Sequence, residues 1–272
     1  MSTTPTWTMD GLRAQLRNER FTASMDLEQP ELGLGAPQWP HGRLLGVACA
    51  DDSRMTLVQE DIYVRDGDLV AAYMHGQSPQ FRMQIYWRWL DRATIGETPG
   101  AHGDELVALE LQVSVQTELL DSWPEVHTQT ELLGGDVAQV AAGEVQQLPT
   151  DAQRVAQFAP AGRRVPRIAL FRPRDATTSY VEIVHPADVS HIEDEATPAR
   201  GAVPTASDAA TVKSPSPREG ALLRHRLFAE HLEKGVIRRA RIRGVIGPRQ
   251  QDVEWAVACA ESFSGTAPPL TA

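Results

Sequence analysis

The sequence predicts a mainly β protein, a large antiparallel β-sandwich with short peripheral helices. Two observations support this fold class. Strand-like alternation of apolar and polar residues recurs on both sides of a segment rich in Ala, Pro, Ser and Thr, whereas helical periodicity is found mainly near the ends of the chain. Successive strands without regularly intervening helices are typical of antiparallel sheets rather than of alternating βαβ folds.

The clearest strand in the sequence is LVALELQVSVQT at residues 106–117. Apolar residues occupy every second position from Val107 to Val115, and small or polar residues fill the positions between them. A strand places each of these sets on one face, whereas a helix would scatter both sets around its axis. We therefore expect a long antiparallel strand with one buried face and one face in contact with water.

A hairpin and a second strand precede it. In DIYVRDGDLVAAY, residues 61–73, Asp66-Gly67 supplies the positive φ angles that a tight turn between two strands needs. In FRMQIYWRWL, residues 81–90, apolar and aromatic residues share one face, and Arg, Gln and Tyr side chains share the other. We expect both stretches to build the sheets.

The chain is expected to divide into an N-terminal tail with a short helix at residues 1–40 and one β-sandwich domain at residues 41–272. The short helix is expected over Met9–Phe21, where leucines recur at helical spacing. Residues 193–220 are nearly free of large apolar side chains, so we expect a mobile insertion in the sandwich domain. A further short helix is expected over residues 251–263, near the end of the chain.

The composition indicates a soluble protein in a reducing compartment. The formal charge of -10 disfavours binding to nucleic acid or to an anionic membrane surface. No stretch of about 18 apolar residues could span a membrane, and the first residues lack the features of a secretory signal, so we expect a cytoplasmic location. Cys49 and Cys259 are the only cysteines. Their number allows one disulfide, but their apolar surroundings favour two buried free thiols.

Familiar catalytic motifs are absent from the sequence. It contains no GxxxxGK[ST] phosphate-binding loop, no GxSxG nucleophile elbow, no CxxC pair and no HExxH zinc motif. HPADVSHIEDE, residues 185–195, carries imidazoles and carboxylates, but its spacing matches no zinc pattern and its acids lead into the expected insertion. We therefore expect no metal and no cofactor, and we assign no catalytic residue.

The strongest candidate site is a row of arginines in GVIRRARIRGVI, residues 235–246. On a strand, Arg239, Arg241 and Arg243 share one face at intervals of about 7 Å. In an acidic protein, this row predicts a surface that binds an anionic ligand such as a uronic acid or a phosphosugar. The alternative is that these arginines pair across the sheet with acidic residues such as Glu110.

Two histidines form a second candidate. RHRLFAEHLEKG, residues 224–235, places His225 and His231 on one strand face beside an apolar patch. Either imidazole could act as an acid or a base if a carboxylate such as Glu233 came near, and the alternative is a structural role. We group both histidines with the arginines as candidate ligand-binding residues.

Tryptophans supply a further signal. Trp87 and Trp89 continue the apolar face of their predicted strand and are expected in the core. Trp39 and Trp123 each precede a proline in expected loops. An exposed indole there could stack on a sugar ring, whereas a buried one would anchor its loop.

A strand, the segment HLEKG at residues 231–235 and a long alternating strand follow one another in a mostly antiparallel chain of 272 residues. This pattern resembles the β supersandwich of the galactose mutarotase-like group over roughly Leu44–Ile246, in strand architecture and not in a motif. The resemblance implies a protein that binds or acts on carbohydrates, with histidine and carboxylate groups on a concave sheet. No catalytic segment of that group matches a segment of this sequence.

These observations lead to three hypotheses about function. The first is binding of a carbohydrate or a small anion, with Arg239, Arg241 and Arg243 contacting the ligand and His225 and His231 nearby. The second is an aldose epimerase or a lyase acting on an acidic sugar, which requires a histidine and a carboxylate within hydrogen-bonding reach in a pocket. The third is a non-catalytic interaction module that recruits a protein partner through a strand edge or the insertion.

Overall fold

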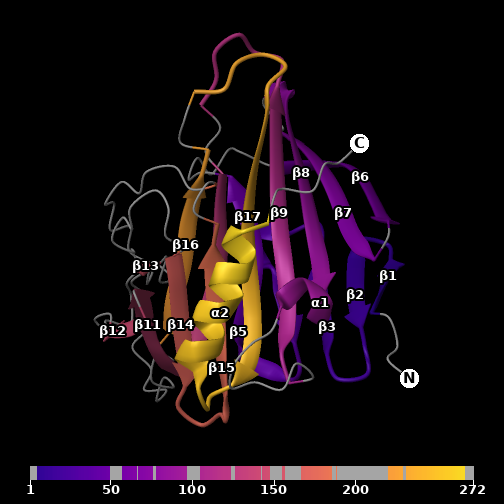
Figure 1. Cartoon of the computed structure of the whole chain (residues 1–272). Helices are drawn as coiled ribbons and strands as arrows, with labels where there is room; N and C mark the ends of the chain where they lie inside the picture. The colour runs from indigo at the N-terminus through magenta and orange to yellow at the C-terminus, as the bar shows by residue number, and fades with distance from the viewer. Residues whose placement is uncertain are drawn as a thin grey trace, which may run out of the picture.

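The protein is built from two large β-sheets packed face to face, as the computed structural model in Figure 1 shows. This confirms the predicted fold class. The structure describes residues 5–49, 57–65, 67–75, 78–96, 105–123, 126–141, 143–147, 155–156, 167–185, 188, 220–228 and 231–266.

Within the described residues, the first sheet has eight strands in the order β1-β2-β3-β4-β5-β10-β16-β13. Neighbouring strands are antiparallel except for the short pair β13 and β16. The strands are β1 (Thr6–Asp10), β2 (Arg13–Arg17), β3 (Thr22–Asp26), β4 (Leu34–Ala36), β5 (Trp39–Cys49), β10 (Val126–Leu133), β13 (Val155–Ala156) and β16 (Gly220–Leu227).

The second sheet has nine strands in the described part of the chain, in the order β12-β11-β14-β15-β17-β9-β8-β7-β6. They are β6 (Leu57–Arg65), β7 (Asp68–His75), β8 (Ser78–Leu90), β9 (Val107–Thr117), β11 (Gly135–Ala141), β12 (Glu144–Gln147), β14 (Arg167–Pro173), β15 (Thr178–Val184) and β17 (Ile237–Pro248). The long strands β9 and β17 pair along ten positions at the middle of this sheet.

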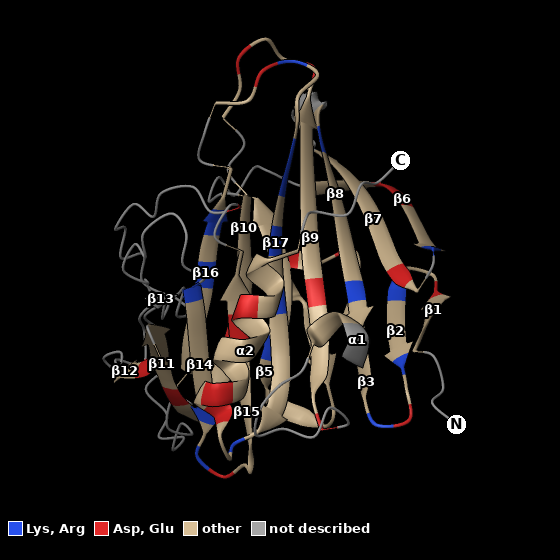
Figure 2. Ribbon diagram, viewed as in Figure 1, with Lys and Arg blue, Asp and Glu red and all other residues tan. Residues whose placement is uncertain are grey.

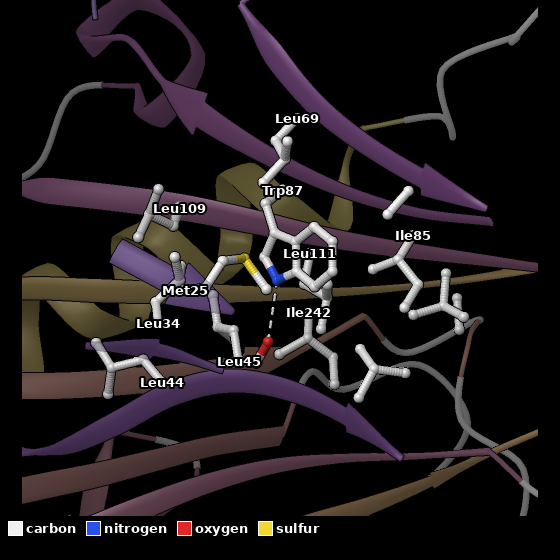
Figure 3. Packing of buried hydrophobic residues seen from close by; sticks show 14 of the residues in the cluster. Met25, Leu34, Leu44, Leu45, Leu69, Ile85, Trp87, Leu109, Leu111 and Ile242 are labelled. Carbon is white, nitrogen blue, oxygen red and sulfur yellow. Dashed lines mark hydrogen bonds between the residues drawn. The ribbon is translucent and has the colours of Figure 1, made fainter. Parts of the chain in front are cut away.

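The main core lies between the two sheets. The alternating apolar residues of β8 and β9 point into it as predicted, and so do Ala240 and Ile242 of β17. Trp87 is fully buried, and its indole Nε1 donates to the carbonyl oxygen of Leu45 on the other sheet at 3.1 Å (Figure 3). A buried indole that finds an acceptor in this way costs little and fixes how the sheets face each other.

Helix α2 (Asp252–Ser264) lies against the outer face of the second sheet, where it contacts β14, β15 and β17 (Figure 1). This confirms the helix predicted near the end of the chain. Its buried residues Trp255, Cys259 and Phe263 recur every four positions and form a second apolar cluster with the sheet. The other helical segments are short: η1 (Pro30–Leu32) and α1 (Arg92–Ile95).

The predicted water-facing side of β9 was wrong. Ala108, Glu110, Gln112 and Ser114 point away from the main core, yet all four are buried. Ala108 belongs to the cluster beneath α2. The second sheet is therefore a middle layer over part of its area, and a polar residue on its outer face need not meet water.

The predicted N-terminal helix over Met9–Phe21 was also wrong, and so was the separation of residues 1–40 from the sandwich. The described part of that region forms β1 to β4 and the start of β5, all in the first sheet. Gly11 has a φ of +57° and forms a turn inside the predicted helix. Beyond that turn, buried and exposed residues alternate, with Ala14 and Leu16 buried. The leucine spacing had suggested a helix, but the stretch has the period of two that is typical of a strand.

Other local predictions hold. β6 and β7 form the predicted hairpin, with Arg65 opposite Asp68 and Gly67 at a φ of +86°. Gly220 begins β16, and the remainder of the predicted insertion at 193–220 lies outside the described residues. In the described part of the chain, no helix is long and apolar enough to cross a membrane.

Candidate functional site

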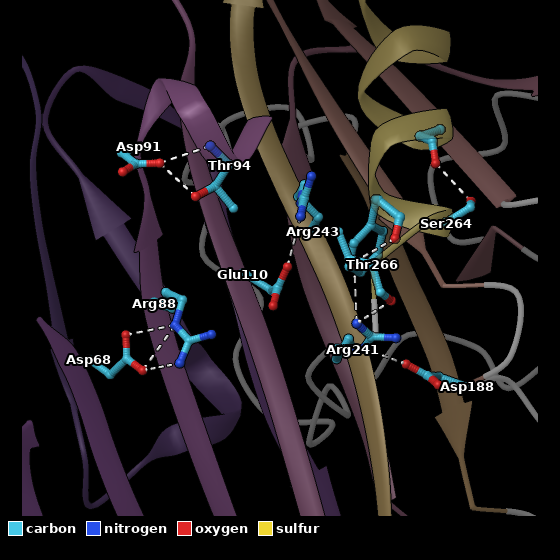
Figure 4. A network of polar contacts seen from close by, with 12 residues as sticks. Asp68, Arg88, Asp91, Thr94, Glu110, Asp188, Arg241, Arg243, Ser264 and Thr266 are labelled. Atoms are coloured by element: carbon cyan, nitrogen blue, oxygen red, sulfur yellow. Dashed lines mark hydrogen bonds and ion pairs between the residues drawn. The ribbon is translucent and has the colours of Figure 1, made fainter. Parts of the chain in front are cut away.

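Two of the three arginines predicted to form a binding row, Arg239, Arg241 and Arg243, are enclosed. Arg241 and Arg243 lie on the outer face of the second sheet, and only 2% and 1% of their surfaces are exposed. Nη2 of Arg243 donates to Oε2 of Glu110 at 3.0 Å, the cross-strand pairing that the sequence had offered as the alternative. Nε of Arg241 donates to Oδ2 of Asp188 at 3.0 Å, and its Nη1 donates to the carbonyl oxygen of Thr266 at 3.1 Å (Figure 4).

The end of α2 covers these guanidinium groups. The ring centroid of Phe263 lies 4.3 Å from the guanidinium carbon of Arg243 and 5.5 Å from that of Arg241. Such cation–π contacts are strongest where water is excluded. The two arginines therefore fasten the helix to the sheet, whereas Arg239 is half-buried further along the strand. Ligand contact by Arg239, Arg241 and Arg243 stays a prediction.

Arg243 and Glu110 belong to a longer row of alternating charge. Asp68, Arg88, Glu110 and Arg243 stand opposite one another on β7, β8, β9 and β17. Figure 2 shows the row as red, blue, red and blue segments on these strands. Nε of Arg88 donates to Oδ1 of Asp68 at 2.9 Å, and this hydrogen bond raises the pKa of Arg88. Opposite charges across a sheet stabilise it, so the row is part of the scaffold.

His225 lies between the sheets rather than on a surface. Its Nε2 is 2.7 Å from Oε1 of Glu182, which belongs to β15 of the opposite sheet. Oε2 of Glu182 accepts hydrogen bonds from the hydroxyls of Tyr180, at 2.6 Å, and Thr130, at 2.5 Å. Burial, followed by the charge of Glu182, raises the pKa of Tyr180. The carboxylate near His225 is thus Glu182 and not Glu233, which the sequence had suggested.

The pair of His225 and Glu182 has the partners of an acid–base site, but it is buried. Both residues are almost completely enclosed, and the main core surrounds them. Sequence reasoning missed Glu182. The available signal was a single acid in the otherwise apolar strand SYVEIV, whose neighbours on both faces are buried.

His231 occupies a different place, in the connection that leads from β16 to β17. Its Nε2 is 2.7 Å from Oδ1 of Asp121, and its ring centroid lies 5.6 Å from that of Trp123. The structure therefore separates the two predicted histidines, one in the core and one at the surface. Each has a carboxylate partner, but only His231 is accessible.

Two connections come together around His231. Residues 118–123 follow β9 and residues 231–236 precede β17, and we call them the apical loop pair (top of Figure 1). The backbone N–H of Leu232 donates to the carbonyl of Ser122 at 2.9 Å, and the hydroxyl of Ser122 donates to the carbonyl of Leu232 at 3.1 Å. With Leu232 buried beneath them, these bonds hold the loops as one unit.

The apical loop pair and the adjoining start of β17 expose large apolar side chains. The exposed fractions are 83% for Leu120, 64% for Trp123 and 51% for Ile237. Tryptophans elsewhere are enclosed: Trp7, Trp39, Trp87 and Trp255 are buried and Trp89 is half-buried. Trp39 thus anchors its segment, whereas Trp123 presents its indole to the solvent.

An open groove of about 930 Å³ lies at the other end of β17, where several turns converge. It is lined by Arg20 and Phe21 after β2, Thr177 before β15, and Ile246 and Arg249 around the end of β17. Sequence reasoning missed this groove because its residues come from turns far apart in the chain.

No metal site is found among the described residues, where no three His, Cys, Asp or Glu side chains are grouped to hold an ion. In HPADVSHIEDE, His185 is buried 5.1 Å from the ring of Phe263, and its Nδ1 is 3.6 Å from Oδ1 of Asp188. The rest of that stretch, including His191 and Glu193, lies outside the described residues.

Comparison with protein-family models and with curated proteins found no match. The fold alone therefore defines the class of protein, a mainly antiparallel β-sandwich with a helix on one outer face. The resemblance to the galactose mutarotase-like group stays a prediction.

Proposed function

We propose that the protein binds a neutral carbohydrate at the apical loop pair. The observation that carries this proposal is the exposed indole of Trp123, held beside the hydrogen-bonding pair of Asp121 and His231. A pyranose ring has an apolar face of C–H groups and a rim of hydroxyls. An exposed indole suits the face, and adjacent imidazole and carboxylate groups suit the rim.

The geometry of the loop pair supports a preformed surface. The bridge between Ser122 and Leu232 is next to Trp123, and the backbone N–H of Gly235 donates to the carbonyl of Thr117 at 3.0 Å. Little chain entropy is then lost when a ligand binds, which favours affinity from a small contact area.

Charge selects among carbohydrates. The apical loop pair, residues 118–123 and 231–236, contains three carboxylate residues, Glu118, Asp121 and Glu233, and one lysine, Lys234. Polyanions such as acidic polysaccharides and nucleic acids are repelled by such a surface. We therefore expect neutral oligosaccharides rather than uronic acid polymers at this site.

The test is tryptophan fluorescence during titration with neutral hexasaccharides of glucose, xylose and mannose, with polygalacturonate for comparison. Binding should change the emission of Trp123 and protect it from iodide quenching. Trp123→Ala should weaken binding by roughly 10-fold or more. Leu32→Ala, which trims another exposed apolar residue, should bind like the wild type. Equal binding by the wild type and Trp123→Ala would contradict the proposal.

A protein partner at the same loop pair is a second candidate function. The exposed side chains of Leu120 and Ile237 favour it, because they extend the apolar surface beyond what one sugar ring covers. Leu120→Ser separates the two functions: it should leave oligosaccharide binding unchanged and remove docking of a protein. The epimerase or lyase hypothesis stays a prediction, and it requires access to His225 and Glu182.

A further inference from the structure

The groove at the end of β17 combines positive charge with an apolar floor. Among the described residues that line it, Arg20 and Arg249 are basic and Glu105 is acidic. The nearby carboxylate of Asp252 is hydrogen-bonded by Arg172 and by the hydroxyl of Ser179, and it also interacts electrostatically with Arg249. Basic residues thus outnumber acidic ones among the described residues of the lining, which is a local exception in a chain with a formal charge of -10.

Arg249 is fixed by its backbone and by one end of its guanidinium. Its N–H donates to the carbonyl of Thr177 at 2.8 Å, and its Nη1 donates to the carbonyl of Pro173 at 3.1 Å. Among the described residues, its Nε and Nη2 have no hydrogen-bond acceptor. These donors are suited to a carboxylate or phosphate oxygen, which guanidinium groups bind through paired hydrogen bonds.

The opposite wall is also held in place. The side-chain oxygen of Asn18 accepts hydrogen bonds from the backbone N–H groups of Arg20, at 2.7 Å, and Phe21, at 3.3 Å. The amide oxygen of Gln38 accepts one from the backbone N–H of Thr22 at 3.2 Å. Such side-chain bonds fix the course of a turn, so the groove is preformed.

The floor of the groove is apolar. Phe21 packs against Trp89 with ring centroids 6.0 Å apart, and Val107 and Ile246 pack against the main core. The volume is in the range of small-molecule sites, which join a mostly apolar lining to a few polar groups that fix orientation. A ligand that fits these features has a compact body with one apolar face and an anionic substituent.

We propose that this groove binds a small organic anion, a carboxylate or phosphate monoester carried on a single ring. Arg249 and Arg20 contact the anionic group, and the ring lies over Phe21 and Ile246. The carboxylate of Glu105 reduces the net positive charge of the groove. The site therefore suits a ligand with one anionic group rather than a polyanion. The site is independent of the carbohydrate surface, which lies at the start of β17.

The experiment is isothermal titration calorimetry of the full chain with glucuronate, glucose 6-phosphate and benzoate, each at about 5 mM. Glucose and inorganic phosphate test the ring and the anion separately. At least one ring-bearing anion should bind, and glucose and inorganic phosphate should bind at least roughly 10-fold more weakly. Preference for glucuronate or for benzoate then identifies a sugar or an aromatic body.

Variants locate the site. Arg249→Gln should weaken binding by roughly 10-fold or more, and Arg20→Gln should weaken it in the same direction. Arg82→Gln removes the same charge from an exposed position on β8 and should bind like the wild type. Circular dichroism of each variant confirms that it is folded. The proposal is overturned if no anion binds, if inorganic phosphate binds as tightly as the ring-bearing anions, or if Arg82→Gln lowers affinity as much as Arg249→Gln.

Discussion

Arg243 and Glu110 stand opposite each other on β17 and β9 and form a buried ion pair, with Nη2 of Arg243 3.0 Å from Oε2 of Glu110. Phe263 of α2 covers the guanidinium at 4.3 Å. The pair therefore connects three elements: two central strands and the helix. Charges removed from water in this way cost free energy unless each has its partner, so the pair acts as a unit.

Breaking the pair should destabilise the protein. Glu110→Ala leaves a buried guanidinium without its carboxylate and should lower the free energy of unfolding by about 3 kcal/mol. Replacing both residues, as in Glu110→Leu with Arg243→Met, should restore most of this loss because no charge stays buried. Urea unfolding measures both effects.

The exposed pair of Arg82 and Glu60, 2.7 Å apart, is the matched control. Glu60→Ala should cost less than about 1 kcal/mol, because water screens the remaining charge. If Glu110→Ala costs no more than Glu60→Ala, the buried pair does not hold α2 to the sheet.

Glu182 should be among the residues that are least tolerant of substitution. It accepts hydrogen bonds from Tyr180 and Thr130 and contacts His225, so it joins two sheets through one carboxylate. Glu182→Ala leaves several buried polar groups without a partner and should cost about 3 kcal/mol or more in unfolding free energy. Glu118→Ala, at an exposed acid 3.4 Å from Lys234, should cost less than about 1 kcal/mol. A similar cost for both variants would rule out the cluster as a structural connection.

Periodicity predicted the long strands β8 and β9 but not what covers them, and it missed β1 and β2. The alternation in β8 and β9 identified the residues that face the main core, because a period of two depends only on the strand itself. The same pattern predicted water on the outer face of β9. Whether a helix covers that face depends on the packing of α2, which follows more than a hundred residues later.

The two candidate histidines show the same limit: a local pattern does not reveal tertiary contacts. His225 and His231 share a sequence pattern, yet one contacts Glu182 in the core and the other contacts Asp121 at the surface. The residues around each histidine do not reveal its partner, because that partner lies on a distant segment of the chain. Trp39 and Trp123 also share a pattern, a tryptophan before a proline in an expected loop, yet Trp39 is buried and Trp123 is exposed.

The two free cysteines should react slowly with alkylating reagents while the protein is folded. Cys259 is buried, and Cys49 is half-buried rather than fully buried as predicted. Loss of water contact raises the pKa of Cys49 to about 11 and that of Cys259 to about 12, where the charge of Arg243 opposes part of the rise. At pH 8 both thiols are protonated, and the thiolate is the reactive form. Labelling with iodoacetamide, followed by mass spectrometry, should show modification only in urea. Rapid labelling of Cys259 in the native protein would show that α2 opens.

The lowered pKa of Asp252 predicts how the stability of the protein depends on pH. Burial alone would raise its pKa, but hydrogen bonds from Arg172 and Ser179 and the charges of Arg172 and Arg249 together lower it. These bonds fasten the start of α2 to β14 and β15.

A carboxyl group whose pKa is lower in the folded state stabilises that state fully above its unfolded pKa, near 4, and loses this contribution as the pH falls through the folded pKa. The unfolding free energy should therefore decrease below about pH 4, and Asp252→Asn should remove part of this decrease while costing about 2 kcal/mol at pH 7. Asp10→Asn, at an exposed acid of β1, should leave the curve unchanged. Urea unfolding between pH 2 and 7, in steps of about one unit, measures this difference. Identical pH dependence for the wild type and Asp252→Asn would show that Asp252 does not couple α2 to the sheet.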